Sequence, residues 1–224
     1  MERPKRSGAG HAGTFAHSFE LTAPVPAKAA PNGPSWIHEI KHDGHRCAAV
    51  IGDGTVRLVT RNHRDVTKRF HRIAAELLLL KDHDAIIDGE IGAQDEKGVA
   101  RLDNLHRAIE AGAYEQLIYF AFDLLHIDGV DLRPRPLLSR KECLRDLLEP
   151  LKGSRIQYCD HLEGDPGPLY ARLCEIGAEG IVSKAAAAPY RGGRDPNWLN
   201  VKCRAWSARR SGGAAKWSVV KPRT

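Results

Sequence analysis

The sequence predicts an α+β fold with largely antiparallel sheets. Three observations favour this class over a regular repeat of strand, helix and parallel strand. Strand pairs and isolated helices alternate irregularly along the 224 residues, no internal repeat is found, and no glycine-rich phosphate loop of the Walker or Rossmann type is present. The length is sufficient for one large domain with tails.

The first third of the chain is interpreted as a lead-in followed by a hairpin and a helix. Residues 1–34 are rich in Gly, Pro and Ala and lack periodicity, which predicts a flexible segment before a domain that begins at Trp36. After the strand-like run WIHEI, two strands are expected around the turn Asp53-Gly54. Apolar residues at helical spacing then predict a helix over 65–80 with Asp65 as its N-cap.

The remaining elements alternate between strands and helices. They are a strand over 84–93, a helix over 102–112, a long buried strand over 116–129, a helix over 137–151 capped by Ser139, a strand over 155–162, a helix over 165–177 ended by Gly177, and strands over 179–185 and 197–204.

The cysteines do not form a recognisable framework. The chain has an odd number of them, widely spaced and without a Cys-x-x-Cys pair: Cys47, Cys143, Cys159, Cys174 and Cys203. This pattern argues against a disulfide scaffold and against a structural zinc site, so we expect reduced thiols in the core. The histidines are scattered as well, and His38, His42 and His45 are interpreted as solvated strand or loop residues.

Hydropathy indicates a protein without a membrane segment. No apolar run approaches the ~20 residues of a membrane-spanning helix. The basic start, MERPKRSGAGHAG, is not followed by an apolar stretch, so neither a secretory signal nor an anchor is expected. We therefore expect a cytoplasmic protein.

The positive charge is concentrated at the C-terminal end. The net charge is +6, and residues 203–224 hold six Lys or Arg and no acid, which leaves 28 basic and 28 acidic residues in the rest of the chain. A cationic segment that also contains Trp206 and Trp217 suits a polyanion such as nucleic acid. On composition alone, a disordered solubilising tail is an equally good interpretation.

Lys41 lies where the apolar run WIHEI ends and an Asp43-Gly44 turn begins. A lysine becomes a nucleophile when its amine is desolvated or lies beside other cations, and the end of an apolar strand near further basic residues offers both. The pattern Lys-x-Asp-Gly is short and also arises by chance, so a surface lysine before a turn is the alternative.

Four further clusters of charged or aromatic residues follow at predicted strand ends. They are TRNHRD around Arg61, IIDGEI around Glu90, FDLL at Phe122, and EGIVSK with WLNVK, which contain Glu179, Lys184 and Lys202. In order and rough spacing, these clusters and Lys41 resemble the signature motifs of the covalent nucleotidyltransferases. They are most similar to those of ATP-dependent DNA ligases, and in particular to the ligase domain of bacterial end-joining ligases.

The resemblance covers about residues 36–204 and implies a fold and a reaction. The fold would be an ATP-grasp-like nucleotidyltransferase domain over 35–204, with two antiparallel sheets flanked by helices, a nucleotide cleft between them, and a basic tail over 205–224. Lys41 would attack the α-phosphorus of ATP, form a lysyl-AMP phosphoamide and release pyrophosphate. AMP would then pass to the 5′-phosphate of a nick in duplex DNA, and the 3′-hydroxyl would displace it, as DNA repair and recombination require.

The same resemblance implies roles for individual residues. Carboxylates suit Mg²⁺ or Mn²⁺, arginine forks suit ribose and phosphate, an aromatic ring can stack on adenine, and lysines can neutralise phosphate charge. The implied ATP or AMP ligands are Glu39, Ile40, Arg46, Arg61, Glu90, Phe122, Lys184 and Lys202. The implied metal ligands are Glu90 and Glu179, and the implied DNA contacts are Arg61, Arg204, Arg209 and Arg210. The alternatives are core packing for Phe122 and surface ion pairs or solvated strand ends for the charged residues.

Two features depart from the family pattern. The last nucleotide-binding motif of close relatives has two lysines two residues apart, whereas Asn200 occupies the first of these places in WLNVK. The family also appends an oligonucleotide-binding barrel, which cannot be built from the twenty residues after WLNVKCR. We therefore expect a monomer acting on nicked DNA, with end-joining or repair proteins supplying the missing function. An RNA ligase, a capping guanylyltransferase, or a weakly active nucleic-acid-binding remnant are the alternatives.

Overall fold

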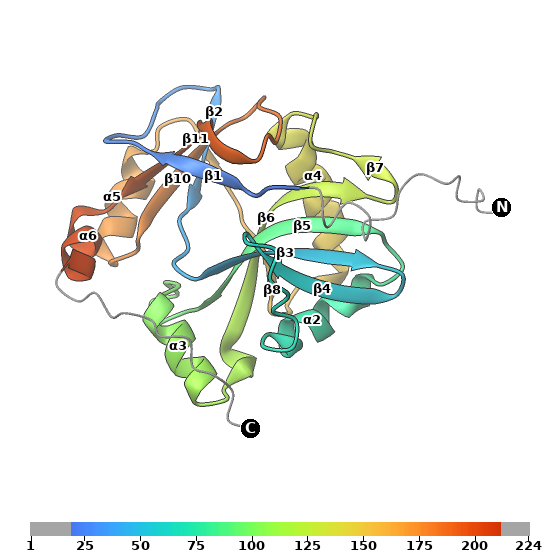
Figure 1. The fold of residues 1–224 in the computed structure, drawn as a ribbon. Helices are drawn as coiled ribbons and strands as arrows, with labels where there is room; N and C mark the ends of the chain where they lie inside the picture. The colour runs from blue at the N-terminus through green and yellow to red at the C-terminus, as the bar shows by residue number, and fades with distance from the viewer. Residues whose placement is uncertain (1–18, 212–224) are drawn as a thin grey trace.

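The computed structural model describes residues 19–211 and contains two β-sheets with helices outside them (Figure 1). One sheet has the strand order β1-β11-β10-β2-β9 and the other the order β4-β3-β5-β6-β7, with β8 paired to β6. The strands of the first sheet are β1 (Thr22–Pro26), β2 (Trp36–Ile40), β9 (Leu162–Glu163), β10 (Gly180–Ala185) and β11 (Gly193–Lys202). Those of the second are β3 (His45–Gly52), β4 (Thr55–Thr60), β5 (Ala85–Ala93), β6 (Leu117–Ile127), β7 (Val130–Asp131) and β8 (Ile156–Tyr158).

The helices lie on the outer faces of the two sheets. They are α2 (His71–Leu77), α3 (Leu102–Glu110), α4 (Leu137–Leu148), α5 (Gly167–Glu175) and α6 (Arg204–Ser211), with short 3₁₀ turns η1 (Leu78–Leu80), η2 (Tyr114–Gln116) and η3 (Glu149–Leu151). In Figure 1, α5 and α6 lie beside β10 and β11, while α2 and α4 accompany the second sheet. The predicted α+β class with mainly antiparallel sheets is confirmed.

The lead-in prediction is wrong for residues 22–26, because they form β1 at the edge of the first sheet. This strand pairs in parallel with β11, from Thr22 opposite Gly193 to Pro26 opposite Asn200. The two prolines, Pro24 and Pro26, disfavour a strand from the sequence alone. An edge strand tolerates proline, however, because one side of its backbone has no hydrogen-bonding partner. At the other end, α6 begins at Arg204, the last residue of the predicted domain, and extends to Ser211 in the segment expected as a tail. Residues 212–224 lie outside the described residues.

The hairpin predicted at Asp53-Gly54 is confirmed by strands β3 and β4. Both turn residues have positive φ, 50° for Asp53 and 70° for Gly54, as a two-residue turn of this kind requires. The β3 strand also pairs with β5, and β5 pairs with β6, so the hairpin forms one half of the second sheet.

Three other boundaries differ from the predictions. The helix expected over 65–80 begins only at His71, because Asp65 forms a bridge to Val59 and its carboxylate accepts the Thr67 N–H. The α4 helix starts at Leu137, so Ser139 lies inside it and does not cap it. The segment 155–162 is not one strand, since β8 joins the second sheet and β9 the first.

Apolar side chains pack in three layers. The largest cluster lies between the second sheet and its helices, with Leu58, Ile73, Leu105 and Leu144 among its members. A second cluster joins the facing sides of the two sheets and includes Val50, Ile118 and Trp198. The third packs α5 against the first sheet around Leu173 and Ile181. The two sheets are therefore held by a shared apolar layer.

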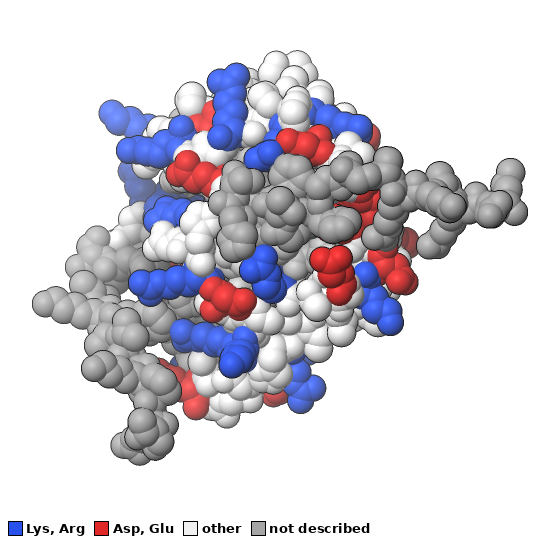
Figure 2. All heavy atoms as spheres, turned by 45° about the vertical axis from the view of Figure 1, so that its right-hand side comes forward, with Lys and Arg blue, Asp and Glu red and all other residues white. Residues whose placement is uncertain are grey.

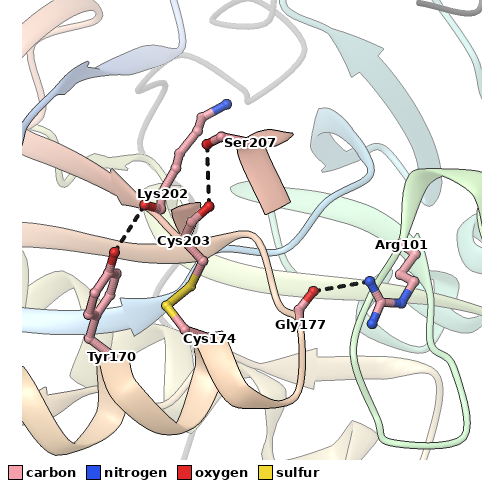
Figure 3. Close-up of a disulfide and its surroundings, with 7 residues drawn as sticks. All are labelled: Arg101, Tyr170, Cys174, Gly177, Lys202, Cys203 and Ser207. Atoms are coloured by element: carbon pink, nitrogen blue, oxygen red, sulfur yellow. Dashed lines mark hydrogen bonds between the residues drawn. A yellow bond between two sulfur atoms is a disulfide. The ribbon is translucent and has the colours of Figure 1, made fainter. Parts of the chain in front are cut away.

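A disulfide links Cys174 of α5 to Cys203, which follows β11 (Figure 3). The expectation that all five cysteines are reduced is therefore wrong for this pair, whereas Cys47, Cys143 and Cys159 are free. The two cysteines are 29 residues apart in sequence, and this spacing alone does not predict that the end of α5 packs against the end of β11. Neighbouring contacts fasten the same corner: the Tyr170 hydroxyl donates to the Lys202 carbonyl at 3.0 Å, and the Cys203 N–H donates to the Glu179 carbonyl at 2.9 Å.

Among the described helices, none combines the length and the apolar character that crossing a membrane would require.

The disulfide closes a long loop, so its loss is expected to destabilise the fold. The chain-entropy relation for 29 residues gives about 3 to 4 kcal/mol of stabilisation. We expect Cys174→Ser to lower the free energy of unfolding in urea by this amount, and Cys143→Ser, which removes a free thiol, to lower it by less than about 1 kcal/mol. Thiol titration of the denatured, unreduced protein should count three thiols and rise to five after reduction. Five thiols before reduction would contradict the disulfide.

Candidate active site

Lys41 is the first residue after β2, and it lies where two adjoining cavities meet. Its N–H donates to the Gly180 carbonyl at 3.0 Å, which fixes the end of β2 against the start of β10. The larger cavity has a volume of about 480 Å³ and the smaller about 160 Å³, and Lys41, His42 and Glu90 line both. The Gly44 that follows allows the loop to touch β5, because a Cβ atom there would lie 2.1 Å from the Ile91 carbonyl oxygen.

Glu179 holds two of the predicted lysines in the larger cavity. Its Oε2 atom lies 2.8 Å from Lys41 Nζ and its Oε1 atom 2.9 Å from Lys202 Nζ. The Lys202 ammonium also lies 4.4 Å from the centre of the Trp206 ring, which lines the same cavity from α6. Gly180 has a φ of +149° and lets β10 approach β11 so closely that a Cβ atom would meet the Val201 carbonyl at 2.0 Å. The carboxylate is thereby held between the two strand ends.

Glu90 faces the same space from β5. Burial raises the pKa of Glu90 to about 7, against the attraction of Lys41 and Arg46 and with the repulsion of Glu179 and Asp88. Two carboxylates that repel one another beside an open, polar cavity suit a divalent cation. Within residues 19–211, no three or more His, Cys, Asp or Glu side chains gather as a metal site. Glu90 and Glu179, which both line the larger cavity, could hold Mg²⁺, because this ion commonly takes few protein ligands and completes its shell with water and phosphate oxygens.

The smaller cavity is lined by aromatic rings and cations. Phe122 of β6 packs edge-on against Trp198 of β11, with ring centres 6.1 Å apart. The Lys184 ammonium lies 4.0 Å from the centre of the Trp198 ring and 4.5 Å from that of Phe122. Arg46 covers the same rings, and its fork is held by Asp88 through contacts of 3.0 and 2.6 Å. This mixture of flat apolar surface and fixed charge suits a nucleobase and its ribose.

Glu39 is buried at the wall of this cavity, directly before Ile40 and Lys41. Its Oε2 atom lies 2.5 Å from Lys184 Nζ, and its Oε1 atom lies 2.6 Å from the ammonium of Lys141. Burial alone would raise the pKa of Glu39, but attraction to Lys141 and Lys184 outweighs burial and holds that pKa below its ordinary value. Ile40 points outward, is 43% exposed, and forms part of the rim.

Most of the predicted nucleotide ligands line one of the two cavities, but Arg61 and the DNA contact predicted at Arg204 do not. Arg61 is exposed in the turn after β4 and lines neither cavity. Asn200 lies beside them, and its amide is 3.5 Å from the carbonyl of Pro24, which lines the smaller cavity. Arg204 is exposed at the start of α6. The side chains of Arg209 and Arg210 lie outside the described part of the structure. In the face shown in Figure 2, Lys and Arg side chains are interspersed with Asp and Glu.

Four residues at the site were missed by sequence reasoning. Asp88 and Trp198 occur inside the motifs IIDGEI and WLNVK, but the resemblance implied no role for them. Lys141 lies on a helix that contains no motif. His42, expected to be solvated, is half-buried instead: its ring stacks on Phe120 with centres 3.8 Å apart, and burial lowers its pKa to about 4. His38 is fully buried and hydrogen-bonds Ser183 at 2.9 Å.

Comparison with known proteins identifies the fold as that of a DNA ligase catalytic domain. The solved structure of mycobacterial DNA ligase D complexed with ATP and MES is similar with a TM-score of 0.73 and 26% identity, over 84% of this chain and 61% of that one. A family model described as the ATP dependent DNA ligase domain matches residues 20–202. The chain belongs to the ATP-dependent DNA ligase domain family, as its motifs predicted.

Two curated relatives show how much of a longer protein this chain corresponds to. The multifunctional non-homologous end joining protein LigD of Pseudomonas aeruginosa is 35% identical over 203 residues, which are 90% of this chain and 24% of the relative. A DNA ligase of Methanoculleus marisnigri is 30% identical over 89% of this chain and 36% of its own length. The chain thus spans about a quarter to a third of these relatives.

The raised pKa of Glu90 predicts that this carboxylate destabilises the fold once it is ionised. A group with a folded pKa of about 7 and an ordinary value of 4.5 stabilises the folded protein while protonated, and this contribution is lost as the pH rises from 4.5 through 7. We expect Glu90→Gln to raise the free energy of unfolding by roughly 1 to 3 kcal/mol at pH 8 and by much less at pH 5.

Urea denaturation at the two pH values checks this expectation. Glu96→Gln, at an exposed position on the loop after β5, serves as the control and should show the same difference from the unsubstituted protein at both pH values. If the gain in free energy of unfolding of Glu90→Gln over the parent is no larger at pH 8 than at pH 5, the burial argument is contradicted.

Proposed function

We propose that this chain is the catalytic domain of an ATP-dependent DNA ligase and that Lys41 is its nucleophile. The observation that carries the proposal is the position of the Lys41 amine at the junction of an aromatic cavity and a polar one, 2.8 Å from Glu179. Base and ribose would occupy the smaller cavity and the phosphates the larger. The α-phosphorus would then lie near Lys41.

The first step forms a bond between Lys41 Nζ and the α-phosphorus and breaks the bond to the bridging oxygen of pyrophosphate. The amine must release a proton before it attacks, and Glu179, its direct partner, is the group that can accept or relay it. Lys202 would neutralise charge that develops on the phosphate in the larger cavity. Lys184 would contact the nucleoside in the smaller cavity, where Arg46, held rigid by Asp88, would position the ribose. Mg²⁺ at Glu90 and Glu179 would supply further neutralisation of phosphate charge.

The later steps require nicked duplex DNA. AMP would pass from Lys41 to the 5′-phosphate of the nick, and the 3′-hydroxyl would then displace AMP to form the phosphodiester. The similarity to the multifunctional non-homologous end joining protein of Pseudomonas aeruginosa supports a role in end joining. We propose that the domain acts in the cytoplasm as a monomer on nicked DNA, together with end-joining or repair partners.

Self-adenylylation gives the direct test. Incubation with α-labelled ATP and Mg²⁺ is expected to leave a label on the protein that survives denaturing electrophoresis and is lost in acid, because a phosphoamide bond hydrolyses there. Lys41→Ala should take up none. Lys152→Ala, which removes an exposed lysine of an ion pair with Glu149, should be labelled like the parent. No label on the unsubstituted protein at high concentration would refute the proposed first step.

The basic C-terminal segment is expected to contribute to DNA affinity without contributing to adenylylation. The truncation should follow Ser211, because α6 contains Trp206, which packs into the larger cavity. It removes Lys216, Lys221 and Arg223. Each cation that contacts a phosphate adds about 0.9 to the slope of log K against log salt on duplex DNA, so the slope should fall by up to about 2.7.

Nicked-duplex affinity at several salt concentrations measures the slope for both chains, and the labelling assay provides the control. We expect labelling of the shortened chain to match that of the full chain. Equal slopes would show that the segment does not contact DNA phosphates. Exposed residues such as Arg61 and Arg204 would then be the candidates for DNA contacts.

A further inference from the structure

Lys141 lies outside both cavities and yet holds the carboxylate that forms a wall of the smaller one. Its ammonium lies 2.6 Å from Glu39 Oε1 and donates to the Cys159 carbonyl at 2.8 Å. The Lys141 side chain is 1% exposed and that of Glu39 is 3% exposed. The family motifs discussed above do not include Lys141, which projects from the middle of α4.

The two oxygens of Glu39 have different surroundings. Oε1 is directed to Lys141 and α4, away from the cavity. Oε2 is directed to Lys184, which lines the smaller cavity together with Glu39, Phe122 and Trp198. A carboxylate oxygen has two lone pairs, so Oε2 can accept a second hydrogen bond from a molecule in the cavity while it retains Lys184.

The two lysines also differ in how firmly they hold their charge. Burial lowers the pKa of Lys184 despite its attraction to Glu39, and repulsion from the neighbouring Lys141 adds to this effect. For Lys141, burial acts in the same direction, but attraction to Glu39 outweighs it and raises the pKa. Lys141 therefore provides the larger of the two attractions that keep Glu39 ionised, and its contact with Oε1 from outside the cavity fixes the orientation of the carboxylate.

We propose that Lys141 is a positioning residue for nucleobase specificity: it fixes Glu39 so that Oε2 accepts a hydrogen bond from the exocyclic amine of adenine. This inference rests on the proposed function. Guanine has an acceptor oxygen where adenine has that amine, so an ionised, immobile carboxylate would repel it. Without Lys141, the carboxylate would turn or take up a proton. A carboxylic acid both donates and accepts, so it would discriminate less between the two bases.

The test compares three triphosphates in the labelling assay: ATP, GTP, and purine riboside triphosphate, which lacks the exocyclic amine. The charge-assisted hydrogen bond predicts that the parent prefers ATP over purine riboside triphosphate by about 10- to 100-fold in kcat/KM. We expect Lys141→Met to reduce this preference, and the preference over GTP, by about tenfold or more. Its rate at saturating purine riboside triphosphate should stay within about threefold of the parent, since that nucleotide makes no such bond.

Arg145→Met is the matched control. Arg145 lies one turn further along α4 and covers the same Tyr158 ring, at 4.9 Å against 4.6 Å for Lys141, but it is exposed and pairs with Asp160. This variant should retain the parent's preference. The double variant Lys141→Met with Glu39→Gln should discriminate no less than Glu39→Gln alone, because Lys141 acts through that carboxylate.

The outcomes separate this inference from the proposed function. A parent that takes up no label refutes the function, whereas a labelled parent with an unchanged preference in Lys141→Met overturns the inference alone. Should Lys141→Met fail to fold, Lys141→Arg keeps a buried cation and is expected to preserve the preference within about threefold. Glu39→Gln should then lose the preference, and full retention of it in Glu39→Gln would equally overturn the inference.

Discussion

The ion pairs of Glu179 are the constraint on which the site depends. One buried carboxylate draws together Lys41 from the end of β2 and Lys202 from the end of β11, while Glu179 itself directly precedes β10. A buried, unpaired carboxylate is costly, so the pairing of these charges and the alignment of the three strands stabilise each other. In the register of β10 and β11, Gly180 lies opposite Lys202, so Glu179 and Lys202 are close neighbours.

Further charges are paired in and behind the smaller cavity, at positions where apolar residues would pack with less cost. Arg46 pairs with Asp88, whose second partner is the Tyr190 hydroxyl at 2.6 Å, and Arg140 pairs with Asp123. Such pairs contribute little net stability, because desolvation offsets the attraction between the charges. They do fix the direction of each side chain. Since Arg46 reaches the smaller cavity, the network behind it provides a rigid cation for a ligand rather than a more stable core.

The sequence was sufficient for the fold class, because that class depends on local patterns. Charged residues in short motifs singled out Lys41, Glu90, Glu179, Lys184 and Lys202, which the structure places around the two cavities, and Asp53-Gly54 identified the hairpin. Contacts between distant segments left no such pattern. The pairing of β1 with β11, the disulfide between Cys174 and Cys203, and the reach of Lys141 to Glu39 across 102 positions all depend on how the sheets and helices pack.

The errors have a common physical origin in competition between local propensity and tertiary partners. Asp65 is a residue type that often caps a helix, but here it forms a β-bridge with Val59, and the helix begins only at His71. His42 has a polar side chain, but Phe120 offered a flat surface inside the fold. Glu179, Lys184 and Lys202 do line the cavities around Lys41, because a buried charge near the end of a strand has few ways to be satisfied. A carboxylate such as Glu179 needs cations, and in this fold those cations are the lysines that the proposed chemistry also needs.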